Sequence, residues 1–140
     1  DVPVIGQEGY DGEMFIKIAG AAAEGVIITT SLDRDSTDPL AQAFIQGFQK
    51  KSGYPADMVS ASTHTAVLVL AEAMKQVDPS DKAALRQAIA STSINAATGN
   101  ISFNKLGEVR KSVQVQVVRD GSWHHFAVIS DPVLLAPPEE

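Results

Sequence analysis

The stretch Gly25-Val26-Ile27-Ile28-Thr29-Thr30 is a run of β-branched residues that follows a glycine, a pattern that predicts a buried strand. The run Val2-Pro3-Val4-Ile5-Gly6 has the same character and predicts another strand. Between the two, apolar residues recur at helical spacing and predict a helix over residues 13–22. The order strand, helix, strand is typical of an open parallel sheet, so the sequence predicts an α/β fold. Because the chain opens inside a strand, we expect further sequence upstream.

Three helices are expected after the second strand, and an antiparallel meander follows them. Asp38 as N-cap and Pro39 in the first turn predict the start of a helix that continues to Ser52. Apolar periodicity predicts two more helices, over residues 58–77 and 81–91. The meander consists of short strands over residues 99–103, 113–117 and 123–129, with Asp120-Gly121 as the last hairpin turn.

The composition narrows the classes of function. The 140 residues carry 17 acidic and 11 basic side chains, and the net charge of −6 argues against a nucleic-acid partner, which would require a clustered basic surface. With no cysteine, the chain has no disulfide, thiolate nucleophile or cysteine-ligated zinc site. No apolar run approaches the roughly 20 residues of a membrane span. Several prolines in residues 131–140 predict a loosely held tail.

No catalytic or metal-binding arrangement stands out, so we expect neither an enzyme nor a cofactor. The sequence lacks a nucleophile elbow, a phosphate loop and a Gly-x-Gly-x-x-Gly motif. Asp33, Asp35 and Asp38 alternate loosely as in a calcium loop, but the required glycine and closing glutamate are missing, which favours a solvated loop. His124 and His125 are adjacent on an expected strand, so they should be exposed on opposite faces and should not share a metal.

Several motifs, taken in order along the chain, resemble one family. They are Pro3-Val4-Ile5-Gly6-Gln7-Glu8-Gly9, Ala23-Glu24-Gly25-Val26-Ile27-Ile28-Thr29-Thr30, Ser62-Thr63-His64-Thr65-Ala66-Val67 and Thr98-Gly99-Asn100-Ile101-Ser102-Phe103-Asn104-Lys105-Leu106-Gly107-Glu108. This ordered set resembles the type I periplasmic solute-binding proteins, and among them the branched-chain amino acid (Leu/Ile/Val-binding) subgroup of ABC transporter substrate-binding proteins. The resemblance covers nearly all of residues 1–130 and implies the C-terminal portion of a two-lobed α/β protein.

The resemblance also implies how the chain is divided between the lobes. Residues 1–28 and 101–130 would belong to the C-terminal lobe, and residues 32–97 to the N-terminal lobe. The chain would cross between the lobes near residues 29–31 and again near residues 98–101. The fragment would therefore contribute segments to both lobes.

Glu8 is the main candidate for a ligand-binding residue. It lies just past the carboxyl end of the first expected strand, the position at which open α/β sheets bind ligands. The resemblance implies that an acidic residue here pairs with the α-ammonium group of an amino acid, a role that suits a carboxylate in a desolvated cleft. The alternative is a solvated loop glutamate. Tyr10 could form a wall of the same cleft or could pack against the following helix.

A second group of candidates lies at the start of the long helix. The resemblance implies that Val59, Ser60 and Ala61, on the other lobe, line the apolar side of the pocket, where small residues leave space for a larger ligand side chain. The alternative is an ordinary helix N-terminus with a capping side chain. His64 stands where the family often has tyrosine, and a lone histidine on a helix is more often packed or exposed than a ligand.

The function that the resemblance implies is solute recognition for an ABC importer, in the periplasm or another extracytoplasmic compartment. Two lobes would close by a hinge motion on an amino acid or a similar small solute, and the closed form would be presented to a membrane permease. The expected partners are the ligand, the ABC permease and the missing N-terminal half of the same protein. Unpaired strand edges would also favour self-association of the fragment. The alternatives are a ligand-sensing module of a receptor or regulator on the same fold, or a metabolic α/β enzyme.

Overall fold

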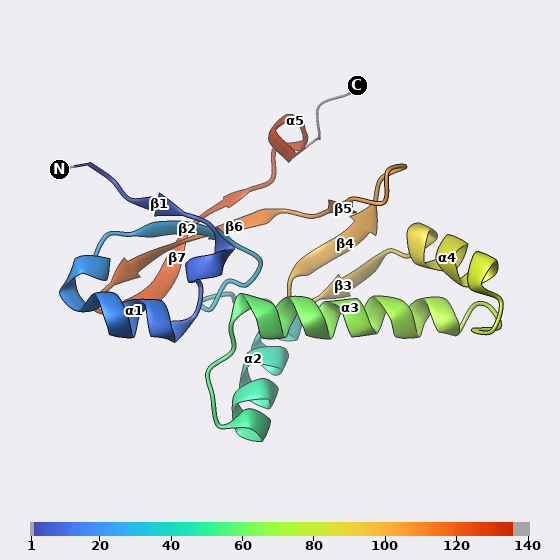
Figure 1. Ribbon diagram of the computed structural model, residues 1–140, viewed down its shortest axis with the longest axis horizontal. Helices are drawn as coiled ribbons and strands as arrows, with labels where there is room; N and C mark the ends of the chain where they lie inside the picture. Colours follow the sequence, from blue (N-terminus) through green and yellow to red (C-terminus); the bar gives the residue numbers. More distant parts are fainter. Residues whose placement is uncertain (1, 136–140) are drawn as a thin grey trace.

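Two separate β-sheets organise the chain (Figure 1). The computed structural model describes residues 2–135. The strands of the larger sheet are β1 (Ile5–Gly6), β2 (Ile27–Thr30), β6 (Val113–Arg119) and β7 (Ser122–Ile129). Their order is β1-β2-β6-β7, with β1 and β2 parallel and the other neighbours antiparallel. The smaller sheet is antiparallel and contains β3 (Ile94–Ala96), β4 (Gly99–Phe103) and β5 (Val109–Arg110).

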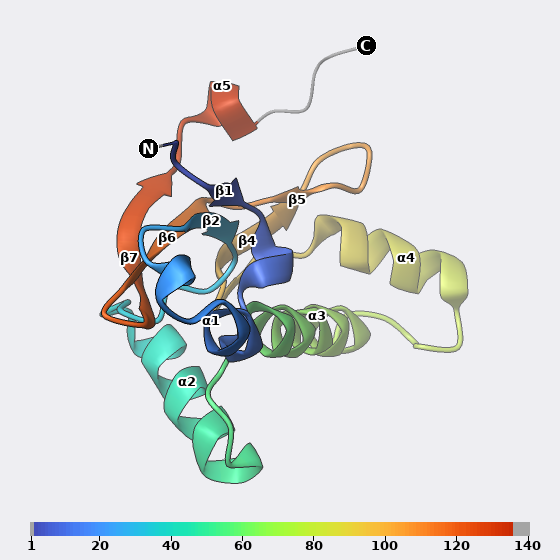
Figure 2. The same ribbon diagram turned by 60° about the vertical axis from the view of Figure 1, so that its left-hand side comes forward.

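Helices cover both sheets. They are α1 (Glu13–Ala19), α2 (Pro39–Ser52), α3 (Met58–Met74), α4 (Lys82–Ser91) and α5 (Pro132–Leu135), together with the 3-10 helices η1 (Glu8–Tyr10) and η2 (Gly20–Ala23). α1 lies against the larger sheet, whereas α3 runs along the smaller one (Figures 1 and 2). Among residues 2–135, no helix combines the length and apolar character needed to cross a bilayer. Of the expected tail, residues 131–135 contain α5, and residues 136–140 lie outside the described part.

Local sequence explains the bounds of the helices. The Asp38 side chain accepts hydrogen bonds from two backbone N–H groups of the first turn of α2, and Gly53 adopts a left-handed conformation after its last turn. The predicted bounds of this helix are therefore confirmed. α1 ends at Ala19, earlier than predicted, because Gly20 leaves the helical conformation at φ +56°.

The smaller sheet is built from three strands that are consecutive in the sequence. β3 and β4 form a hairpin in which Ala96 lies opposite Gly99, and β5 pairs with β4, so these strands all belong to the smaller sheet. The positive φ of Gly99, +96°, permits this tight turn. The chain therefore passes from the smaller to the larger sheet between Arg110 and Val113, and the crossing between lobes expected near residues 98–101 stays a prediction. The assignment of the two sheets to two lobes stays a prediction.

Two clusters of buried apolar side chains stabilise different parts of the chain. The cluster beside the larger sheet consists of Ala23, Val26, Ile28, Val118 and Trp123, with Phe15, Ile16 and Ala19 packed against it. The other cluster joins α2 to the start of α3 and consists of Leu32, Ala56 and Ala61, with Phe44, Ile45 and Phe48 packed against it. Because the two clusters are separate, polar contacts between them help to fix how the two regions sit relative to each other.

A buried carboxylate makes such a contact. Asp11, only 2% exposed, follows η1 and forms an ion pair with Arg34, with 2.5 Å between Oδ1 and Nη1. Its Oδ2 accepts a hydrogen bond from the Thr30 hydroxyl and another from the backbone N–H of Met58, the first residue of α3, both at 2.8 Å. Arg34 also donates to the side chain of Gln116 in β6, at 2.8 Å. Both sides of the molecule therefore meet at Asp11.

Arg34→Met is expected to destabilise the protein, because it leaves Asp11 buried without its cation. Breaking a buried ion pair by removing one partner costs about 3–5 kcal/mol. The free energy of unfolding in urea, measured on the full-length protein, should fall by this amount. The matched control is Arg119→Met at the exposed end of β6, which should change the same quantity by less than about 0.5 kcal/mol. Equal losses in the two variants would contradict the role of the ion pair.

Candidate functional site

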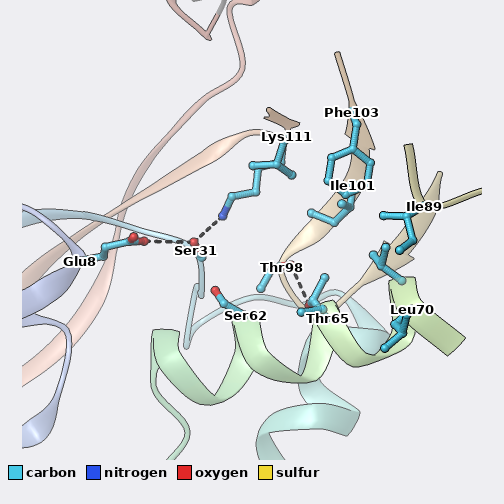
Figure 3. A pocket seen from close by; sticks show the side chains of 13 residues that line it. Glu8, Ser31, Ser62, Thr65, Leu70, Ile89, Thr98, Ile101, Phe103 and Lys111 are labelled. Carbon is cyan, nitrogen blue, oxygen red and sulfur yellow. Dashed lines mark hydrogen bonds between the residues drawn. The ribbon is translucent and has the colours of Figure 1, made fainter. Parts of the chain in front are cut away.

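A cavity of about 510 Å³ is lined by residues from both regions of the chain (Figure 3). Most of its wall is apolar and comes from α3, α4 and the smaller sheet: Val69, Leu70, Ile89, Ile101, Phe103 and Val109. In Figure 3, Ile101 and Phe103 lie on one side of the cavity and Leu70 on the other. A wall of this kind suits a hydrocarbon group of a ligand.

Three polar side chains, Glu8, Ser31 and Lys111, meet at one end of this cavity (Figure 3). The Ser31 hydroxyl donates to Oε2 of Glu8 at 3.3 Å and accepts a hydrogen bond from Nζ of Lys111. Burial lowers the pKa of Lys111 below its ordinary value of 10.5, while the negative charge of Glu8 acts in the opposite direction. This end of the cavity therefore holds one negative and one positive group, which we call the charged end.

The position of Glu8 follows from the packing of η1. A Cβ atom at residue 6 would collide with the Tyr10 ring, so Gly6 allows the turn to fold back onto the end of β1. The Tyr10 ring in turn packs against Phe15 of α1, with 5.1 Å between ring centroids. On the other side of η1, the buried Asp11 is held by its ion pair. Glu8 is thus fixed at the carboxyl end of β1, although its own side chain is exposed.

Comparison with known proteins identifies the family. A family model described as "Periplasmic binding protein" matches residues 2–122. The chain belongs to the periplasmic binding protein family. The resemblance predicted from the sequence is therefore confirmed, and with it the α/β fold class of that family.

Similar members of the periplasmic binding protein family are named for small solutes. The leucine-, isoleucine-, valine-, threonine- and alanine-binding protein of Pseudomonas aeruginosa is 26% identical over 110 residues, which are 79% of this chain and 29% of that protein. A leucine binding protein from Thermotoga maritima is 29% identical with a TM-score of 0.83, and the match covers 92% of this chain and 37% of that one. A solute binding protein of an R. palustris ABC transporter, solved in complex with benzoate, shares the fold at a TM-score of 0.81 and 20% identity, over 91% of this chain and 36% of that one. The chain thus spans 29% to 37% of the length of these relatives.

Among the residues predicted to bind a ligand in this periplasmic binding protein, Glu8 lines the cavity and Tyr10 does not. Tyr10 is 47% exposed, and its ring packs against Phe15. Tyr10 therefore packs against the following helix, α1, which was the alternative to a position in the cleft wall. A ligand-binding role for Glu8 stays a prediction.

The three candidates at the start of α3 do not line the cavity either. Val59 is 61% exposed, and Ala61 is fully buried in the cluster that joins α2 to α3. Ser60 forms a capping box with Asp57: its backbone N–H donates to the Asp57 carboxylate at 2.8 Å, and its hydroxyl accepts from the Asp57 N–H at 3.0 Å. The following turns of α3, with Ser62, Thr65 and Ala66, face the cavity instead.

Sequence reasoning missed Ser31 and Lys111. Ser31 lies in a polar loop after β2, and Lys111 lies in the connection from β5 to β6, where no motif marks it. They meet because β2 pairs with β6 in a register that places Thr30 opposite Gln114. The sequence holds only a weak indication that these two residues belong to a site, namely that each follows the last residue of a strand.

The histidines hold structural positions. The His64 ring packs against Phe44, with 5.0 Å between centroids. His124 and His125 are each 42% exposed, and both bind the loop after β2 rather than facing away from each other. Their Nδ1 atoms lie 3.1 Å from Asp35 and 2.7 Å from Asp33, respectively, next to a β-bulge that shifts the register of β7. Across the described residues, no cluster of three or more His, Cys, Asp or Glu side chains is arranged to hold a metal ion.

The contacts of Asp35 in this loop shift the pKa of its carboxyl group. Partial burial raises its pKa, but hydrogen bonds from the His125 backbone and the His124 ring lower it more, so the net pKa lies below the ordinary 3.8. Folding therefore favours the charged form, and this stabilisation is present above pH 3.8 and lost as the pH falls through the lowered pKa.

Asp35→Asn is expected to lower the stability of the full-length protein at neutral pH by at most about 1 kcal/mol, because the contact is exposed. The difference between wild type and variant should disappear at a pH well below 3.8. Thermal unfolding followed by circular dichroism across this range measures it. A loss of stability that stays constant with pH would contradict the prediction.

Proposed function

We propose that this chain forms one side of the ligand site in the substrate-binding component of an ABC importer. The position of Glu8 carries the proposal, since it places a carboxylate at the charged end of a cavity with an apolar wall. A carboxylate offers several acceptor sites to the three N–H donors of an ammonium group, and the apolar wall suits an aliphatic side chain. An amino acid, or a solute of similar size, combines these features. The names of the Pseudomonas aeruginosa and Thermotoga maritima relatives support this ligand class.

Capture of the ligand would take place by hinge closure of two lobes built around the two sheets. Within residues 2–135, the chain passes from one sheet to the other after β2 and between β5 and β6. The loop between β2 and α2 and the short connection between β5 and β6 can absorb the changes in backbone torsion that domain closure requires. Ser31 and Lys111 lie in these two connections, so a ligand at the charged end would contact the hinge directly.

The other partners follow from this role. A substrate-binding component works outside the cytoplasmic membrane and delivers its ligand to a membrane permease. The opposite wall of the site would come from the N-terminal part of the same protein, because the related chains are longer than this one. No catalytic step on the ligand is part of this mechanism.

Glu8→Gln should weaken binding of the amino-acid ligand and leave folding nearly unchanged. Loss of one member of a desolvated charge pair costs about 2–5 kcal/mol. This corresponds to a loss of affinity of roughly 30-fold to several-thousand-fold. Isothermal titration calorimetry on the full-length protein, with the set of common amino acids, measures the effect.

The matched control is Glu13→Gln, an exposed glutamate in the first turn of α1 that does not line the cavity. Its affinity for the same amino acid should equal that of the wild type. If Glu8→Gln also binds with wild-type affinity, Glu8 is a solvated loop residue and the amino-acid assignment falls.

Apolar side chains on two faces of the chain support the proposed contact with the rest of the protein. Val4 and Ile5 at the edge strand β1 are 57% and 70% exposed, and Val67 of α3, which does not line the cavity, is 60% exposed. β1 pairs only with β2 among the described strands, so its other edge is unpaired. An unpaired edge next to exposed apolar residues recruits other strands.

The isolated 140-residue chain is therefore expected to self-associate. Size-exclusion chromatography with light scattering at micromolar concentration should show dimers or larger species. The full-length protein, in which these faces are covered, should be less associated under the same conditions. A clean monomer of the isolated chain would show that the exposed apolar faces do not need a partner.

A further inference from the structure

The most unusual group in the cavity is the Lys111 ammonium. It is half-buried and points into the charged end, where the neutral Ser31 hydroxyl accepts its hydrogen bond (Figure 3). Glu8 is the charged group that acts on it, and the two are joined only through Ser31. A desolvated cation with a neutral hydrogen-bond acceptor is poorly compensated, and an anion in place of that acceptor would be bound more strongly.

We propose that Lys111 is a second recognition residue of this cavity, which binds the carboxylate of a ligand whose ammonium group binds Glu8. The inference rests on the proposed function, and adds a cationic partner on this chain to any carboxylate-binding groups upstream.

The geometry of the charged end fits an α-amino acid. Both side chains are hydrogen-bonded to the Ser31 oxygen, so Oε2 of Glu8 and Nζ of Lys111 lie within roughly 6 Å of each other. An α-amino acid carries its ammonium and carboxylate groups on one carbon atom, so a ligand that displaces the Ser31 bridge can reach both side chains. Its side chain would then extend along the apolar wall formed by Leu70, Ile101 and Phe103.

The electrostatics make both charges of the ligand necessary. A ligand with an ammonium group alone would bring a second cation next to Lys111, and a ligand with a carboxylate alone would bring a second anion next to Glu8. Like charges at close range disfavour binding, so the pair rejects singly charged analogues of an amino acid. The lowered pKa of Lys111 agrees with a need for an anionic partner, because burial disfavours the charged form of the ammonium group. A bound carboxylate would stabilise that charged form again.

The experiment uses the full-length protein and three probes of nearly the same shape. Leucine carries both charges, isocaproate only the carboxylate, and isoamylamine only the ammonium group. Calorimetry or competition against bound leucine gives their affinities for the wild type, Lys111→Gln and Lys111→Arg. Lys105→Gln, in the exposed turn after β4, is the matched control. Lys111→Met replaces the glutamine variant if that variant does not fold.

Lys111→Gln should weaken leucine binding by roughly 10- to 100-fold, whereas Lys111→Arg should retain most of the affinity and Lys105→Gln all of it. Isoamylamine should bind the Lys111→Gln variant as well as or better than it binds the wild type, because the repelling cation is gone. Equal loss of leucine and isoamylamine would overturn the proposal, since Lys111 would then only hold Glu8 in place. Unchanged leucine binding would overturn it as well.

The same measurements separate this inference from the proposed function. If Glu8→Gln binds leucine normally while Lys111→Gln does not, the role of Glu8 falls and that of Lys111 stands. If Glu8→Gln loses leucine binding while Lys111→Gln keeps it, only the role of Lys111 falls. If the wild type does not bind leucine, both the amino-acid assignment and this inference are overturned.

Discussion

The buried carboxylate of Asp11 is the constraint on which the arrangement of the molecule depends. It must be compensated, because a charge taken out of water without a partner costs several kcal/mol. Its partners come from separate parts of the chain: the Arg34 guanidinium from the loop after β2, the Thr30 hydroxyl, and the first backbone N–H of α3. A helix N-terminus also favours a negative charge, so Asp11 contributes to the start of α3 as well. Satisfying one carboxylate therefore fixes the position of the loop, the strand and the helix together.

This constraint reaches the candidate site through η1. Only two residues separate Asp11 from Glu8, and η1 is too short to bend independently of either. With Asp11 anchored on one side and Gly6 packed under the Tyr10 ring on the other, Glu8 stays at the end of β1 although its own side chain is exposed and its hydrogen bond with Ser31 is only partly buried. The site residue can remain exposed and available to a ligand because its neighbours provide the stability.

The sequence predicted those features that local chemistry determines. The bounds of α2 follow from Asp38 and Gly53, and the last hairpin turn from Asp120-Gly121. The position of Glu8 follows from the end of a strand, which a pattern of β-branched residues can show. The hairpin of β3 and β4 was missed, because Ile94–Ala96 is too short to show alternation. Lys111 was missed for a different reason: its contact with Ser31 joins residues 80 positions apart, and depends on how β2 pairs with β6.

The placement of the charged end would also link ligand recognition to the proposed hinge motion. Ser31 and Lys111 lie in the two connections between the sheets, and their hydrogen bond joins one connection to the other. A rotation of one sheet relative to the other would be absorbed in these two segments. A ligand that replaces the hydrogen bond with two contacts of its own would therefore bind most strongly at one particular angle between the sheets. A ligand shifts a conformational equilibrium only by the difference between its affinities for the two conformations. Tighter binding at one angle between the sheets would therefore favour closure of the protein around the ligand.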